Sequence, residues 1–350
     1  QSSEQLKYLS EEGKGEALND PKASSITFYD KGALALHILR EIVGDEVFKV
    51  GVKNYLVKNQ FQNVSIKDFL HEIEFIYGKS LSNFDRDWIK QTKFPYEEVY
   101  QSLMKSNFMR DYFNVLSLRP LSMSSKILDF DKILDSSNYF LSQEVVFQLQ
   151  NEPISSTLPI YKKAFKTNDI NIRQAIALSM NKIPSELKTD YESLLDDKSY
   201  VTQEIAFGNL CANFYLDRTK YLDKMDTVIG FRDKNIRQFW LFMALITEDY
   251  NPKKKGAYIN ELKKYSSSNY GYTVREKAFE HLGYLSLWDS GTLNNLIDAC
   301  QHHYWRFRNF SRKLLMELCK NDIYKKQLIL LNDTLDNQAQ FFLNKILKEN

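Results

Sequence analysis

A short polar motif occurs twice in the second half of the chain, and it limits the possible folds more than any other feature. The first copy is DINIR at residues 169–173, and the second is DKNIR at residues 233–237. Each copy leads into an apolar run, and weaker copies occur at Val201, Val274 and Phe307. A unit that recurs about every 30 to 40 residues is typical of stacked helical repeats, because one such unit cannot bury its apolar face alone.

The composition supports a helical interpretation of these repeats. Only 12 glycines and 7 prolines occur in 350 residues, which favours helices joined by short loops. The apolar runs contain the small residues Ala206, Ala278 and Ser311, which allow neighbouring helices to approach each other. The pattern resembles HEAT repeats, so we predict an all-α fold with a HEAT-like α-solenoid over residues 156–350.

Helical periodicity also extends through the first part of the chain. Residues 1–25 are polar and indicate a helix fragment followed by a loop. Apolar residues then recur at helical spacing from Phe28 to Val43, and Gly44 supplies a stop signal. Asp45 can begin a second helix that runs through Tyr55. Its expected inner face contains Val47, Phe48, Val50, Gly51 and Leu56.

Two more helices are predicted before a domain boundary. Ser65 and Asp68 resemble a capping box, and the helix that they begin should end at Gly78. A fourth helix beginning at Ser82 should end before Pro95, because proline lacks an amide proton and restricts the preceding residue. We therefore predict a domain over residues 1–95 and a helical connector over residues 96–155.

Charge, hydropathy and cysteine content exclude several classes of protein. Lys and Arg total 47 against 45 for Asp and Glu, so the one-sided basicity of a nucleic-acid-binding protein is absent. The longest apolar run, Phe239 to Ile246, is far shorter than a membrane span. Cys211, Cys300 and Cys319 form no CxxC pattern, so we expect buried thiols rather than disulfides or a zinc site. The localisation stays open.

The histidines do not form a metal-binding motif. His71-Glu72 begins an HExxH pattern, but Phe75 occupies the position of the second histidine. The adjacent pair His302-His303 would diverge by about 100° on a helix and would suit one metal ion poorly. We interpret His37 and His281 as hydrogen-bonded histidines at the edge of the core. We therefore expect no metal site and no cofactor site within this chain.

Two ordered motifs point to a family. The first is ITFYDKGA at residues 26–33, and the second is WIKQTKFP at residues 88–95. Together they resemble the zinc aminopeptidases of the aminopeptidase N and leukotriene hydrolase family, which are gluzincin-type metallopeptidases. The resemblance implies that residues 1–95 are the C-terminal helical part of a thermolysin-like catalytic domain. The helical remainder is similar to the C-terminal domain of that family.

By this resemblance Tyr29 is the catalytic residue of the chain. Its phenol would donate a hydrogen bond to the oxyanion that forms on the scissile carbonyl. One preorganised donor of this kind is worth about 3 to 4 kcal/mol of the activation barrier. The alternative is that the Tyr29 ring staples the entry loop to the core. We expect Lys31 and Gly32 to be structural, with the lysine meeting solvent or a carboxylate and the glycine allowing close approach of another helix.

Other parts of the family pattern are missing from these residues. The Gly-x-Met-Glu-Asn motif and HExxH with its distal Glu are absent, and the first residue is Gln1 rather than methionine. We therefore expect both motifs upstream, in a longer parent that binds one zinc ion and hydrolyses N-terminal residues from peptides. The present chain should contact that missing N-terminal catalytic half and should be inactive alone. The alternative is a non-enzymatic HEAT-type scaffold that binds a protein or peptide partner.

Overall fold

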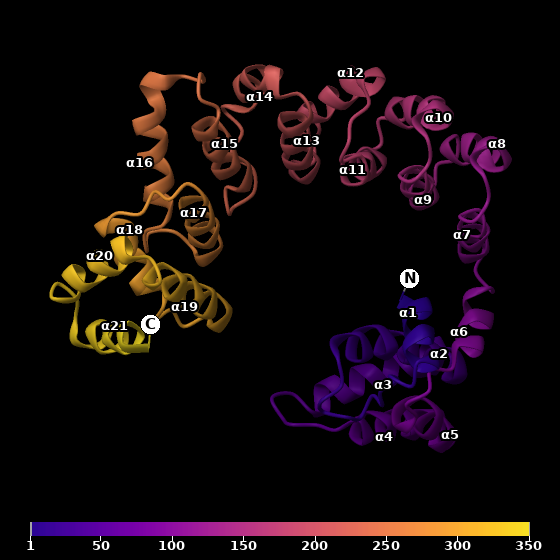
Figure 1. Cartoon of the computed structure of the whole chain (residues 1–350). Coiled ribbons are helices and arrows are strands. Elements are labelled where there is room, and N and C mark those ends of the chain that lie inside the picture. Colours follow the sequence, from indigo (N-terminus) through magenta and orange to yellow (C-terminus); the bar gives the residue numbers. More distant parts are fainter. Residues whose placement is uncertain (1, 350) are drawn as a thin grey trace. The chain divides into compact units, whose positions relative to one another are not determined.

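The computed structural model describes residues 2–349, and every regular element in that range is a helix (Figure 1). The all-α prediction is therefore confirmed. The chain divides into two compact units, Gln1–Ser117 and Leu118–Asn350. The predicted domain limits at residues 95 and 155 stay predictions, and their outer ends, residues 1 and 350, lie outside the described range. None of the helices in that range is long and apolar enough to cross a membrane.

The first unit is built from short helices around one apolar core. Its most deeply buried side chains include Leu39, Ile73, Trp88 and Val99. Two of its helical segments, η1 and η2, are π-helical turns. The elements are α1 (Ser2–Glu11), η1 (Ile26–Lys31), α2 (Gly32–Val43), α3 (Asp45–Lys58), α4 (Ile66–Tyr77), α5 (Ser82–Phe84), η2 (Asp85–Lys90), α6 (Tyr96–Leu103) and α7 (Asn107–Ser117).

The ends of these helices follow the predicted local signals. α2 ends at Gly44, which has a φ of 84°, and α4 ends at Gly78, which has a φ of 72°. Both values lie in the region that glycine adopts without steric cost. Ser65 and Asp68 form the predicted capping box, in which each side chain binds the main-chain N–H of the other residue. The predicted stop of α2 and the predicted start and stop of α4 are therefore confirmed, whereas α2 begins at Gly32 rather than at Phe28 because the π-helical turn η1 precedes it.

The inner face of α3 differs in part from the prediction. α3 packs against α4 at Gly51, where a Cβ atom would lie only 2.5 Å from Cδ1 of Ile73. On the same face, the Tyr55 ring packs edge-on against Phe69. Val50 and Leu56 are each one residue away from this face and are exposed, so their predicted burial is wrong.

The second unit consists of helices that follow one another in two rows. Along one row, α9, α11, α13, α15, α17 and α19 each contact the next. The elements are α8 (Met123–Leu134), α9 (Tyr139–Leu149), α10 (Ile154–Lys166), α11 (Ile170–Ser179), η3 (Ser185–Leu187), α12 (Lys188–Glu192), η4 (Ser193–Asp196), α13 (Tyr200–Asn213), η5 (Tyr215–Asp217), α14 (Arg218–Met225), α15 (Asn235–Ile246), η6 (Pro252–Lys254), α16 (Lys255–Tyr265), α17 (Tyr272–Tyr284), α18 (Ser290–Ala299), α19 (Trp305–Cys319), α20 (Asp322–Asn332) and α21 (Asn337–Glu349). Stacked two-helix units produce such rows, and the closer assignment to HEAT-like repeats stays a prediction.

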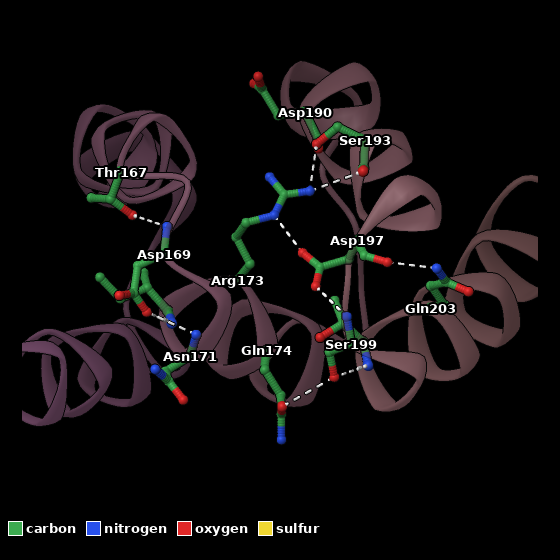
Figure 2. A network of polar contacts seen from close by, with 12 residues as sticks. Thr167, Asp169, Asn171, Arg173, Gln174, Asp190, Ser193, Asp197, Ser199 and Gln203 are labelled. Carbon is green, nitrogen blue, oxygen red and sulfur yellow. Dashed lines mark hydrogen bonds and ion pairs between the residues drawn. The ribbon is translucent and has the colours of Figure 1, made fainter. Parts of the chain in front are cut away.

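The first copy of the repeated motif holds a polar network (Figure 2). Asp169 caps α11 by accepting hydrogen bonds from the main-chain N–H groups of Asn171 and Ile172. Arg173 donates from Nε to Asp197 Oδ2 at 2.6 Å and from Nη2 to the carbonyl of Ser193 at 2.9 Å. The network therefore ties α11 to the segment that follows α12.

Later copies of the motif repeat this connection. Arg237 makes two 2.8 Å hydrogen bonds to Glu261 on α16, and Arg275 makes one of 2.8 Å to Asp298 on α18. The acidic partner lies 24, 24 and 23 residues after Arg173, Arg237 and Arg275 respectively. The repeated arginine therefore joins its own helix to the next helix of the chain or to the loop after it.

Candidate active site

Tyr29 lies in η1, the π-helical turn that continues directly into α2. Its side chain is 78% exposed, and its hydroxyl makes no hydrogen bond with another described residue. The ring therefore does not pack on the core, and the interpretation of Tyr29 as a hydrophobic staple is wrong. An exposed phenol without an internal partner can donate a hydrogen bond to a group from outside this chain.

Two buried polar residues hold the turn on either side of Tyr29. Thr27, two residues before it, donates from Oγ1 to Glu16 Oε2 at 2.6 Å. Lys31, two residues after it, donates from Nζ to the main-chain carbonyls of Glu16 and Gln91, both at 2.7 Å. The main chain that carries Tyr29 is therefore fixed at both ends, while its side chain faces solvent.

The same Glu16 carboxylate also fixes the loop that leads into η1. It accepts hydrogen bonds from the hydroxyl of Ser24 and, at 2.8 Å, from the Ser24 main-chain N–H. The bonds from Ser24 and Thr27 stabilise the charged form and lower the pKa of Glu16. A negative charge is therefore held at the base of the turn.

Lys31 differs from the prediction that it meets solvent or a carboxylate. Its side chain is only 1% exposed, and its hydrogen bonds go to two carbonyl oxygens. Burial lowers the pKa of Lys31 to about 8, and the attraction of Glu16 opposes that change. Spacing in the sequence could have indicated this burial, because Lys31 shares a helical face with Thr27, Ala35 and Ile38.

The second motif lies in the same core and meets the first through Lys31. The carbonyl of Gln91 that accepts from Lys31 lies between Trp88 and Phe94 in the chain. Trp88 is buried, packs edge-on against Phe94, and donates from Nε1 to Glu98 Oε2 at 3.0 Å. The two motifs, far apart in the sequence, therefore form one structural unit.

Two further apolar side chains close to Tyr29 in the chain are exposed. Phe28 is 43% exposed and Leu36 is 44% exposed, and both lie with Tyr29 on η1 and α2. Contiguous apolar surface of this kind commonly marks a place where another chain segment packs. A Cβ atom at Gly32 would lie 3.8 Å from Leu18 Cδ2, which is an ordinary contact, so the close approach of another helix predicted at this glycine is wrong for the described residues.

The histidines and acids are not arranged to hold a metal ion. Among residues 2–349, no group of three His, Cys, Asp or Glu side chains could ligate one. Glu72, in the incomplete HExxH segment, pairs with Lys58. His302 and His303 lie in the turn before α19, so the helical geometry expected for them is wrong. Their rings lie 4.2 Å apart.

The two core histidines differ from each other. His37 lies 2.8 Å from the Ser102 hydroxyl, as expected for a hydrogen-bonded histidine at the edge of the core. His281 stacks on Phe242, and its Nδ1 is buried without a hydrogen-bond partner in the described part of the chain. Burial lowers the pKa of His281 to about 4. The expectation of a hydrogen bond is therefore confirmed for His37 and is wrong for this nitrogen of His281.

The three cysteines are buried thiols, as the sequence predicts. Burial raises the pKa of Cys211 to about 12 and also raises the pKa values of Cys300 and Cys319. A nucleophilic cysteine needs a lowered pKa and access to solvent. These thiols have neither property, so Tyr29 remains the candidate for chemistry in this chain.

Comparison with known proteins finds a matching family over the first part of the chain, together with several relatives. Residues 16–88 match the Peptidase family M1 domain. Probable aminopeptidase 1 of Sulfurisphaera tokodaii is 26% identical over 217 residues, which are 55% of this chain and 27% of that relative. Leucyl aminopeptidase of Saccharolobus solfataricus is 32% identical over 88 residues, which are 25% of this chain and 11% of that relative.

A bacterial relative matches over a shorter region. Aminopeptidase N of Lactococcus lactis is 35% identical over 71 residues, which are 20% of this chain and 8% of that relative. No solved structure matches the chain significantly. The chain thus spans only a small part of the length of these curated relatives. Both motifs of the sequence lie in or directly after the region that matches the family.

Proposed function

We propose that this chain, which is related to the M1 aminopeptidases, is the C-terminal part of an enzyme that removes N-terminal residues from peptides. The first unit would complete a thermolysin-like catalytic domain, and the second unit would be a HEAT-like domain that covers the cleft. The observation that supports this best is the exposed phenol of Tyr29 on a turn held by buried Thr27 and Lys31.

In this proposal Tyr29 acts as the donor to the oxyanion. Negative charge develops on the oxygen of the scissile carbonyl during attack, and a phenol O–H directed at that oxygen stabilises the charge. The phenol keeps its proton and donates a hydrogen bond. Because the main chain on both sides of Tyr29 is fixed, the donor needs little rearrangement when the charge forms. Preorganisation of this kind is the main source of such stabilisation.

The zinc ion implied by the family does not fit the residues of this chain. The donor groups found among residues 2–349 do not converge on any metal site, so no step proposed here depends on a metal. The ligands would come from the N-terminal catalytic half of the parent. The exposed apolar surface of Phe28, Tyr29 and Leu36 would pack against that half. We therefore expect no hydrolysis by the 350-residue chain alone.

The test is a conservative substitution in the full-length parent protein. Tyr29→Phe removes the hydroxyl and keeps the ring. We expect kcat for an aminoacyl-4-nitroanilide to fall by about 100- to 1000-fold, with a much smaller change in KM, because the lost bond forms mainly in the transition state. Tyr8→Phe, which removes the hydroxyl of another exposed tyrosine of the first unit, is the matched control. Near-normal kcat in Tyr29→Phe would refute the role of Tyr29.

A non-enzymatic scaffold is the second candidate function. It is favoured by large apolar side chains that stay exposed at or near the first residues of helices in the second unit, including Phe140, Tyr200 and Trp305. Exposed aromatic residues commonly serve as anchors for protein or peptide partners. If the full-length protein hydrolyses no aminoacyl substrate but retains a peptide that Trp305→Ala releases, this function replaces the first.

A further inference from the structure

A pocket of about 640 Å³ lies between α19 and α21 in the second unit. The two helices contact each other, and Figure 1 shows them side by side near the C-terminus. Three cationic side chains and several apolar ones line the pocket. They include Arg308, Arg312, Lys345, Met316, Phe341 and Phe342.

The cations of this pocket have no acidic partner among the side chains that the structure describes. None of the described residues that line the pocket is Asp or Glu. Arg308 donates to the carbonyls of His302 and His303, and Arg312 donates to the carbonyl of Cys300. In contrast, Arg237 and Arg275 in the preceding repeats pair with carboxylates. Three like charges without a counter-charge on a described lining residue repel one another, so an anion that enters the pocket would relieve that repulsion.

The guanidinium groups are held in place by their existing contacts. Arg308 and Arg312 are four residues apart on α19, so they lie on one face of the helix. The Nε atom of Arg312 is 2.9 Å from the Cys300 carbonyl, and its guanidinium lies 4.9 Å from the centre of the Phe342 ring. These contacts leave the two terminal nitrogens of Arg312 without a hydrogen-bond acceptor among the described residues. Two parallel N–H donors of this kind match a carboxylate.

We propose that this pocket binds a carboxylate that is attached to an apolar body. Arg308, Arg312 and Lys345 receive the carboxylate, and Met316, Phe341 and Phe342 receive the apolar body. Its volume is that of a site for a small molecule or a few residues of a peptide. The ligand is therefore either the carboxyl-terminal residue of a peptide or a free acid with an aromatic or aliphatic group. The proposal does not depend on peptidase activity.

Calorimetric titration of the 350-residue chain at low ionic strength tests this proposal. The probes are acetyl-Ala-Ala-Phe with a free carboxylate, the same peptide with a terminal amide, and 3-phenylpropionate. We expect at least one of the two acids to bind. If the peptide acid binds, it should bind at least about 10-fold more tightly than its amide, because only the acid carries a negative charge that pairs with the arginines and the lysine. Added salt should weaken binding of the acid.

Two substitutions locate the binding site. Lys345→Gln and Arg312→Gln should each weaken binding of the acid by about 10-fold. Because Arg312 also holds the Cys300 carbonyl, its loss costs stability, whereas Lys345 is exposed and its replacement keeps the fold. Lys313→Gln removes the same charge from an exposed position of α19 outside the pocket and is the matched control.

The outcomes separate the two sources of ligand. Binding of acetyl-Ala-Ala-Phe but not of 3-phenylpropionate identifies a peptide terminus as the ligand, and the reverse identifies a free acid. The proposal is overturned if neither acid binds, if the amide binds as tightly as the peptide acid, or if Lys345→Gln changes binding no more than Lys313→Gln does.

Discussion

Replacing Lys31 by methionine tests the description of the candidate site most directly. The variant removes the ammonium but keeps a side chain of similar length. It leaves the carbonyls of Glu16 and Gln91 without the donor that now lies 2.7 Å from each. An orphaned buried acceptor costs about 1 to 3 kcal/mol. Against this, the variant also removes the cost of burying a charged group.

The balance between these two effects depends on pH. The pKa of Lys31 is about 8 in the folded chain, below its ordinary value of 10.5. Below pH 8 both the folded and the unfolded chain carry the ammonium, and the cost of burying it is fully present. Between pH 8 and 10.5 the folded chain releases the proton while the unfolded chain keeps it, so the free energy of unfolding rises with pH. From pH 7.5 to 9.5 this rise is about 2 kcal/mol.

We therefore expect the free energy of unfolding of wild type, minus that of Lys31→Met, to increase by about 2 kcal/mol from pH 7.5 to 9.5. The free energy of unfolding of each protein can be measured by brief subtilisin digestion at increasing urea concentrations. Mass spectrometry then follows the loss of peptides from residues 85–95. These peptides report unfolding of the first unit, which contains Lys31 and Gln91. The contributions of other titrating groups to the free energy of unfolding cancel, because the two proteins are compared at the same pH.

The control for this experiment is Lys67→Met, which replaces an exposed lysine on α4. Its stability difference from wild type should stay constant with pH. If the Lys31→Met difference is equally constant, the amine of Lys31 is not a buried group with a lowered pKa. If Lys31→Met is as stable as wild type at pH 9.5, the two carbonyl bonds do not hold the turn below Tyr29.

Two further predictions concern packing and the repeated arginines. Gly51→Ala should destabilise the first unit by about 1 kcal/mol in urea unfolding, because the clash of its Cβ with Ile73 outweighs the gain in helix propensity. Ile73→Val removes the clashing Cδ1 methyl, so it should cost less stability in the Gly51→Ala background than in wild type. If Gly51→Ala instead stabilises the first unit, the close approach of Gly51 to Ile73 is refuted. Arg275→Met should cost about 2 to 3 kcal/mol of unfolding free energy, because it orphans the carbonyls of Ser266 and Asn295. Exposed Arg232→Met is its control, and an equal effect of the two would contradict the structural role of Arg275.

The helices with strong local signals could be predicted from the sequence. Gly44 and Gly78 end helices through their own conformational freedom, and Ser65 and Asp68 cap α4 through bonds within four residues. Asp169 caps α11 in the same way. All of these effects act over a few neighbouring residues, so the sequence contains the whole interaction.

Burial of single side chains was harder to predict because it depends on distant segments. The helical spacing of Lys31 could indicate that it is buried, but one of the two carbonyls that bind it belongs to a residue 60 positions away in the chain, and a lysine is normally expected at the surface. The sequence predicts both Val50 and Gly51 on the inner face of α3, and Gly51 packs against Ile73 of α4 while Val50 is exposed. An error of one residue in the face of a helix turns a side chain by about 100° and reverses its exposure.

The candidate sites differ in how far the sequence could reveal them. Tyr29 could be proposed because its motif has a recognisable order, and the exposure of its side chain comes from the structure alone. The cationic pocket could not be predicted, because Arg308, Arg312 and Lys345 resemble ordinary solvated charges in the sequence. Only the contact between α19 and α21 brings them together.

The arginine bridges of the second unit constrain how this chain can change in length. The span from arginine to acid stays at 23 or 24 residues, although the spacing between motif copies varies. Insertions and deletions should therefore be tolerated between the acidic residue of one pair and the next copy of the motif, because no arginine–carboxylate pair spans that segment. An insertion between Arg237 and Glu261 would instead move the two residues of an ion pair apart. Over evolutionary time, such a domain can gain or lose whole repeats and vary its linkers, while the segment inside each bridge keeps its length.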